Sequence, residues 1–195
     1  MDGLDWTASA MRAARAQLDI AAHNLANAST DGYRKSAAAV ALTHRGLTVA
    51  ARATHEQGAV RNTGRAFDLA LLGDGVFHAG DVRTRNGAFT RDRDGWIVDD
   101  RGRRLYGEHG ALRVSEHAKI DADGAVREGG RVVERIPLPP GTRLLIGALE
   151  TSTVNPIGET LAILTAQRAF ETAQKTLLAI DATRDKTAND VVRVR

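Results

Sequence analysis

The chain has 195 residues and no cysteine, which excludes disulfides, thiolate metal sites and cysteine nucleophiles. Aromatic residues make up only 4% of the chain, whereas hydrophobic residues make up 43%. Any core must therefore be built mainly from Ala, Leu, Val and Ile. No apolar run approaches the roughly 20 residues of a membrane-spanning helix. The sequence thus predicts a core of small aliphatic side chains and no membrane insertion.

The chain also lacks a large excess of positive or negative charge. The chain has 27 basic and 24 acidic residues, a formal charge of +3. Arg and Asp alternate in the stretch "RDRDGWIVDDRGRR" at 91–104. Such alternation is typical of a solvated mixed surface, whereas nucleic-acid binding needs positive charge gathered on one face. We therefore expect no nucleic-acid partner.

Motifs of catalysis are missing as well. The six histidines are scattered without metal-ligand spacing, and no nucleophile elbow or phosphate-binding Gly-rich loop occurs. The "DRDG" and "DADG" turns resemble calcium loops, but Arg101 and Gly130 stand where the twelfth-position Glu would be. The sequence predicts no catalytic, cofactor-binding or metal-binding residues, no cofactor, and no enzymatic activity.

Both ends of the chain repeat with a period of seven, which is typical of a helix that packs against another helix. Large residues at one seam position alternate with mainly small residues at the other. The N-terminal helix should end at "NASTDGY", where Asn27 and Gly32 tolerate left-handed backbone. The C-terminal helix should begin at Asn155-Pro156 and reach the mid-180s or beyond. The predicted large seam residues are Leu4, Met11, Leu18, Ile163, Phe170 and Leu177.

The middle of the chain has short β-like runs between closely spaced turn signals, which predicts antiparallel hairpins. The sequence therefore predicts an α+β fold. Residues 1–36 and 150–195 should form a discontinuous, coiled-coil-like helical domain from the terminal helices. Residues 37–66 are expected to be an extended connector, and 67–149 a β-rich outer domain. We expect the β domain to be unaffected by a Gly32→Ala change.

The stretch "AAHNLANASTDGYRKS" closely resembles the N-terminal signature of the bacterial flagellar rod and hook family. His23 and Asp31 depart from the usual residues of that signature. A second stretch, "ALETSTVNPIGETLAILTAQRAFETAQK", is similar to the family's C-terminal helix, with departures at Gly158 and Thr160. The matching positions are Asn24, Leu25, Ala26, Asn27, Thr30, Gly32 and Tyr33 in the first, and Glu150, Ser152, Val154, Asn155, Gln167 and Arg168, with Phe170 and Glu171, in the second. A third likeness is to the family's start of the β domain, at 58–107.

The resemblance implies a structural subunit of the basal-body rod, the drive shaft that crosses the periplasm and transmits torque for motility. The terminal helices would form the inner layer of a tubular filament. The implied partners are copies of the chain, other rod subunits and the flagellar export apparatus. Asp2 and Asp5 stand where a signal peptide carries positive charge, so we expect export without a cleaved signal peptide.

The short β region is most like a proximal-rod protein, with the distal rod protein as second choice. An alternative from another class is a free-standing β-domain binding module that its helices dimerise. Such a module should show an aromatic platform. Phe77, Phe89, Trp96 and Tyr106 instead alternate with polar residues, as the core of a hairpin domain would.

Overall fold

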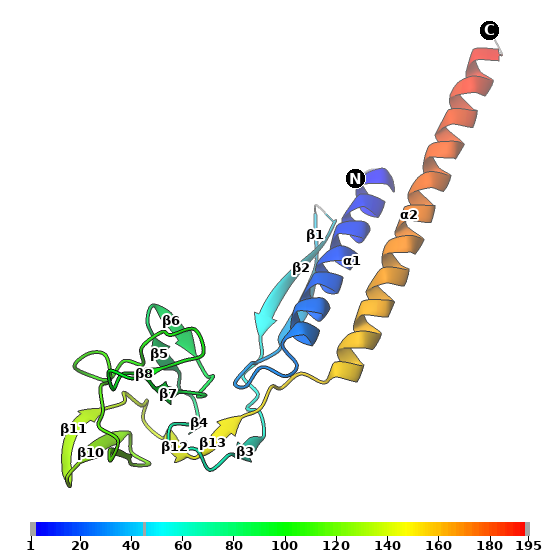
Figure 1. Ribbon diagram of the computed structural model, residues 1–195. Coiled ribbons are helices and arrows are strands. Elements are labelled where there is room, and N and C mark those ends of the chain that lie inside the picture. The colour runs from blue at the N-terminus through cyan, green and yellow to red at the C-terminus, as the bar shows by residue number, and fades with distance from the viewer. Residues whose placement is uncertain (1–2, 45, 194–195) are drawn as a thin grey trace. The chain divides into compact units, whose positions relative to one another are not determined.

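The computed structural model describes the backbone of residues 3–44 and 46–193, and side chains as far as Lys186. The chain forms two compact units (Figure 1). The helical unit contains α1 (Gly3–Ala26), β1 (Ser36–Thr43), β2 (Gly46–Ala53) and α2 (Pro156–Arg193). The β unit contains Asn27–Arg34 and His55–Thr153. This arrangement confirms the predicted α+β class.

In the helical unit, α1 and α2 contact each other and run antiparallel (Figure 1). Asn24 of α1 donates a hydrogen bond to Glu159 of α2, at 3.2 Å. At the other end of α1, a Cβ on Gly3 would lie 3.7 Å from Cδ1 of Ile180. Both pairs are 21 residues apart along their helices, from 3 to 24 and from 159 to 180. The two helices therefore keep one register along their whole shared length.

The face of α2 that meets α1 is defined by its burial pattern. Between 156 and 186, the only residues that are not exposed are Glu159, Ile163, Ala166, Phe170, Ala173, Leu177 and Ile180. They are spaced alternately by four and three residues, the repeat of a coiled-coil seam. On α1 the buried residues are small or short and polar: Thr7, Ser9, Ala13, Ala14, Ala21 and Asn24. Leu4, Met11 and Leu18 are half-buried.

The predicted extended connector at 37–66 is wrong over its first half. β1 and β2 form a continuous antiparallel hairpin, paired from Ser36↔Ala53 to Thr43↔Gly46. The hairpin contacts α1, where the N–H of Leu47 donates to the hydroxyl of Ser9 at 3.3 Å. Alanine has low β propensity, so the strands are hard to recognise in the sequence.

The β unit is built from small sheets, and every pair of strands is antiparallel, as predicted. β3 (Val60–Asn62) pairs with β13 (Ala148–Glu150), and β4 (Leu69–Leu72) pairs with β12 (Arg143–Ile146). β5 (Phe77–Ala79) pairs with β6 (Val82–Thr84), and β7 (Thr90–Arg91) with β8 (Ile97–Val98). β10 (Ala125–Glu128) lies between β9 (Lys119–Ile120) and β11 (Arg131–Arg135). The first and last strands of the unit thus close on each other.

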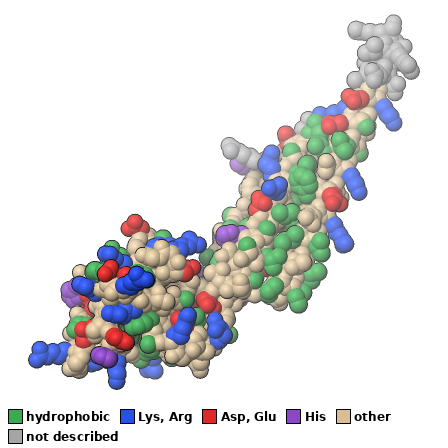
Figure 2. Space-filling model, in the orientation of Figure 1, with side chains coloured by type: hydrophobic (Ala, Val, Ile, Leu, Met, Phe, Trp, Pro, Cys, Tyr) green, Lys and Arg blue, Asp and Glu red, His purple; other side chains and the backbone are tan. Residues whose placement is uncertain are grey.

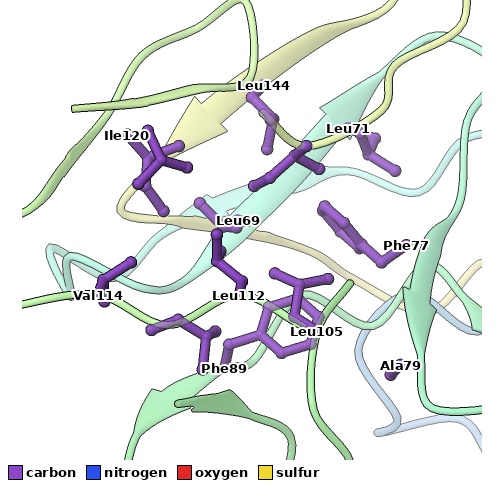
Figure 3. Close-up of a cluster of buried hydrophobic side chains, with 13 residues drawn as sticks. Leu69, Leu71, Phe77, Ala79, Phe89, Leu105, Leu112, Val114, Ile120 and Leu144 are labelled. Atoms are coloured by element: carbon purple, nitrogen blue, oxygen red, sulfur yellow. The ribbon is translucent and has the colours of Figure 1, made fainter. Parts of the chain in front are cut away.

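One hydrophobic cluster fills the β unit (Figure 3). Phe77 and Phe89 meet edge to face there, with ring centroids 5.3 Å apart. Both were predicted to be core residues, and both are buried. Tyr106 is not part of the core, because it is 42% exposed. Trp96 is half-buried, with the guanidinium of Arg104 over its ring at 4.2 Å. Leucine, isoleucine and valine supply most of the remaining core, as the composition implied.

Candidate functional site

The N-terminal signature begins with a buried asparagine in the helical unit. Asn24 is 1% exposed, and its amide pairs with the backbone of Ser36 in both directions. Nδ2 donates to the Ser36 carbonyl at 2.8 Å, and Oδ1 accepts from the Ser36 N–H at 2.9 Å. Nδ2 also donates to Glu159. The side chain of Asn24 therefore acts like a neighbouring strand and joins α1, β1 and α2.

The rest of the signature is a turn in the β unit. The N–H and hydroxyl of Thr30 both bond back to Asn27, at 3.1 and 3.2 Å. Gly32 has φ of 70°, the left-handed backbone predicted at this turn, which favours glycine. A Cβ on Gly32 would lie 2.3–2.5 Å from backbone atoms of Arg85 and Asn86. Both the conformation and the close approach require glycine at this position.

The two terminal signatures meet at that turn. The N–H of Gly32 donates to the carbonyl of Glu150 at 2.7 Å, and the N–H of Thr153 donates to the carbonyl of Tyr33 at 3.0 Å. Segments that lie more than a hundred residues apart in the sequence therefore run side by side. Gly32, Tyr33 and Glu150, which match the sequence signatures, are thus contact positions in the structure.

A buried ion pair anchors this meeting point. Glu150 is 1% exposed, and Arg85 is 6% exposed. Nε and Nη2 of Arg85 reach Oε2 of Glu150 at 2.8 and 2.6 Å. Its remaining donors bond to the carbonyls of Leu71, Gly73 and Gly75, so all five N–H groups have acceptors. Oε1 of Glu150 accepts the N–H of Gly58 at 3.1 Å. Burying such a pair is tolerable because its hydrogen bonds are complete.

The sequence did not point to Arg85. It stands just before "NG" at 86–87, which predicts a turn and gives no reason to expect a buried cation. Glu159 lies in the first turn of α2, where an acidic residue suits the positive end of the helix dipole without any distant partner. No local pattern identifies either residue as a long-range partner. In the structure, Arg85 contacts Glu150 and Glu159 contacts Asn24.

The remaining signature residues have separate places. Val154 is buried, and Oδ1 of Asn155 accepts the N–H groups of Ile157 and Gly158 at 3.1 and 3.3 Å. That confirms the predicted start of α2. Leu25 and Ser152 are half-buried, whereas Ala26, Gln167 and Arg168 are exposed. The signatures therefore include both buried and exposed positions.

One further carboxylate in the β unit has a perturbed pKa. Burial alone would raise the pKa of Asp99, but hydrogen bonds from the side chain and backbone of Arg103 and from the backbone of Arg101 outweigh burial. The net effect lowers the pKa of Asp99. The pair fixes the turn at 99–103, with Arg103 Nη2 2.7 Å from Oδ2. This is a structural ion pair at a turn.

Within the described parts of the chain, no three His, Cys, Asp or Glu side chains are arranged to hold a metal ion. The same residues contain no helix long and apolar enough to cross a membrane. The geometry shows two distant chain ends that fold together, with polar contacts between them.

Comparisons with known proteins show which family the two ends of the chain are similar to. The family model described as flagella basal body rod protein matches residues 4–34, and that described as flagellar basal body rod FlgEFG protein C-terminal matches residues 146–190. These two segments are the ones that meet in the structure. Both ends of the chain are therefore similar to flagellar basal-body rod proteins, which are structural and not enzymatic.

Relatives extend the similarity over most of the chain. The flagellar basal-body rod protein FlgF of Mesorhizobium japonicum is 28% identical over 218 aligned positions, which cover 87% of this chain and 89% of the relative. FlgF of Caulobacter vibrioides is 28% identical, with 83% and 86% covered. The rod protein FlgG of Bacillus subtilis is 25% identical over 244 positions, with 89% and 92% covered.

Proposed function

We propose that the chain polymerises through its terminal helices, with copies of itself and with other rod subunits, into the shaft that transmits torque for motility. α1 and α2 would form the inner layer of that tube. The predicted seam residues and signature residues serve this assembly in the proposal. Similarity to rod proteins at both ends of the chain supports the role, and the surface of α2 supports the route by which the subunits join.

The observation that carries the proposal is that α2 has further faces suited to helix packing. Ile157, Leu161 and Leu164 are 74%, 59% and 47% exposed. Next to the seam runs a second stripe of exposed small residues, namely Gly158, Ala162, Thr165, Ala169, Thr172, Thr176, Ala179 and Thr183. In Figure 2, hydrophobic side chains gather along the helical unit. Exposed apolar surface of this kind marks interaction sites.

The threonines of the small stripe need no outside partner. Those at 165, 172 and 176 each donate their hydroxyl to the carbonyl four residues earlier, at 2.8–2.9 Å. A helix that packs on this face would therefore leave no hydroxyl unsatisfied. Each large exposed side chain would contribute about 1.5–3 kcal/mol on full burial. Several neighbours in a tube would supply that burial.

The proposal includes the location and the export route. The subunit would occupy the periplasm-spanning rod and reach it through the flagellar export apparatus. We place it in the proximal rod because the β region is short. Of the 40 residues from 110 to 149, fewer than half lie in the strands β9 to β13. A larger outer domain would suit the distal rod.

Alignment lengths favour the FlgF members over the FlgG members. The alignment with the Mesorhizobium FlgF is 218 positions long and includes 87% of the 195 residues of this chain, about 170. About 48 alignment positions are therefore gaps in this chain. The alignment with the Bacillus FlgG is 244 positions long and includes 89% of the chain, about 174 residues, so about 70 positions are gaps. The chain thus needs fewer gaps against FlgF, and we propose that it is related to the FlgF branch.

The test changes the exposed α2 face without touching the seam. In a strain that carries only the variant gene, the double change Ile157→Ser and Leu161→Ser should abolish swimming and rod assembly. Val82→Ser, at a 41% exposed position of the β unit, is the control and should swim normally. Both variants should keep the thermal stability of the native chain. Normal rods with the α2 variant would contradict assembly through this face and favour the dimerised β module.

A further inference from the structure

Arg34 is a half-buried arginine whose Nε lacks a hydrogen-bond partner. Its side chain is only 17% exposed. Its Nε is fully buried and has no hydrogen-bond partner among the described residues. The carboxylate that faces it, Oε1 of Glu150, is 3.9 Å away, which is beyond hydrogen-bonding distance. An unsatisfied buried donor of this kind is rare and calls for a partner.

Glu150 cannot neutralise both arginines. Its Oε2 is engaged by Arg85, and its Oε1 accepts the N–H of Gly58. One carboxylate therefore lies between two guanidinium groups. Arg34 is therefore the arginine with an unmet donor, since every donor of Arg85 already has an acceptor. An anion beside Arg34 would supply acceptors that Glu150 does not.

The space for such an anion lies next to Arg34. Two cavities of the β unit, of about 720 and 320 Å³, both have Arg34 and Arg83 in their walls. The larger cavity has an apolar part of its wall, formed by Val76, Leu138 and two prolines, and a charged or titratable part that also includes Asp74, Glu108, His55 and His78. Its volume suits a small ligand.

We propose that the larger cavity is a carboxylate-binding site in which Arg34 and Arg83 hold the anion. A guanidinium presents parallel N–H donors that match the two oxygens of a carboxylate. The apolar wall would cover the carbon chain that bears it. Asp74 and Glu108 disfavour a dianion, which selects a carboxylate over a phosphate. The carboxylate would come from an acidic side chain of another polypeptide or from a free carboxylic acid.

This site is separate from the proposed helix assembly, because every residue that forms it belongs to the β unit. It also differs from the Arg85–Glu150 pair, which is already satisfied within the chain. Loss of ligand binding would therefore leave rod assembly as a separate question. Conversely, failure of the assembly proposal would not remove the site.

The test titrates the full chain with acetate, with the end-blocked tripeptide Gly-Glu-Gly, and with inorganic phosphate at constant ionic strength. Binding is measured by the chemical shifts of backbone amides around the cavity, such as Gly75 and His78. We expect saturable shifts with both carboxylates and at least tenfold weaker binding of phosphate. Tighter binding of the peptide than of acetate identifies a polypeptide source, and equal binding identifies a small acid.

Variants decide whether the named arginines hold the anion. Arg34→Gln and Arg83→Gln should each weaken carboxylate binding at least tenfold. Arg93→Gln, an exposed arginine of the same unit outside both cavities, should change it less than twofold. Arg83 projects from a short hairpin strand and is not part of the buried network, so this variant tests the site even if Arg34→Gln unfolds. Absence of saturation, phosphate binding as tight as carboxylate binding, or undiminished binding by Arg83→Gln overturns the proposal.

Discussion

Replacing Gly32 by alanine should destabilise the β unit, contrary to the expectation from sequence that this unit would be untouched. Gly32 belongs to the β unit, and its N–H bonds to the carbonyl of Glu150. Its φ of 70° costs a residue with a Cβ about 1–2 kcal/mol. The new Cβ would also overlap backbone atoms of Arg85 at 2.3–2.4 Å. Overpacking of this kind typically costs about 1–3 kcal/mol.

The two contributions together give about 2–5 kcal/mol, a large share of a typical domain's stability of about 5–15 kcal/mol. Gly102→Ala is a matched control, because Gly102 has φ of 75° in the same unit and no atom within 4 Å of its added Cβ. It should lose only the conformational part. Thermal denaturation of both variants, with amide exchange at Ile97 to report on the β core, measures the difference. A fall in melting temperature for Gly32→Ala no larger than for Gly102→Ala would refute the role of the close approach.

Three further predictions concern other parts of the chain. Asn24→Ala should cost about 2–4 kcal/mol, because it strands the N–H and carbonyl of Ser36; in assembled rods, faster amide exchange across β1 should reveal this loss, and unchanged exchange would contradict the pairing. The lowered pKa of Asp99 gives stability that is present above the unfolded pKa of about 3.9 and is lost as pH falls through the folded value. Melting temperature should therefore drop steeply below about pH 4, and less steeply in Asp99→Asn, whereas parallel curves would argue against the pair. In a verified monomer, α1 and α2 should exchange amide hydrogens quickly, since a seam of half-buried large residues and alanines buries little area; strong protection at Met11 and Phe170 would show that two helices suffice.

Local signals predicted the parts of the fold that local chemistry decides. The period-seven stripe marks the seam side of α2, because the same spacing that places residues on one helix face is visible in sequence. Asn155 and Pro156 marked the start of α2, since an acceptor side chain and a missing N–H both suit a helix N-terminus. Gly32 marked a turn. In each case the residues that carry the sequence signal lie within a few residues of the structural feature that they predict.

The hairpin at 36–53 could not be predicted in this way. Its strands read "SAAAVALT" and "GLTVAARA", in which alanine gives neither β propensity nor a clear alternation of apolar and polar residues. The exposed face carries Val40 and Leu42, at 51% and 69% exposed, which reverses the usual pattern. The contact of Leu47 with Ser9 of α1 is long-range, so the local sequence gives no sign of it.

The polar contacts of the signatures explain how such small residues can specify one arrangement. An alanine seam lets helices approach closely, but neighbouring registers bury nearly the same area, so burial alone discriminates poorly between them. Asn24 is buried on α1 and donates a hydrogen bond to Glu159 of α2, and a shift of helix register would break this contact. Buried polar residues are known to fix register in this way in coiled coils. We infer that the polar residues of the two signatures specify where the chain leaves and re-enters its helices, while the apolar faces of α2 stay available for its neighbours.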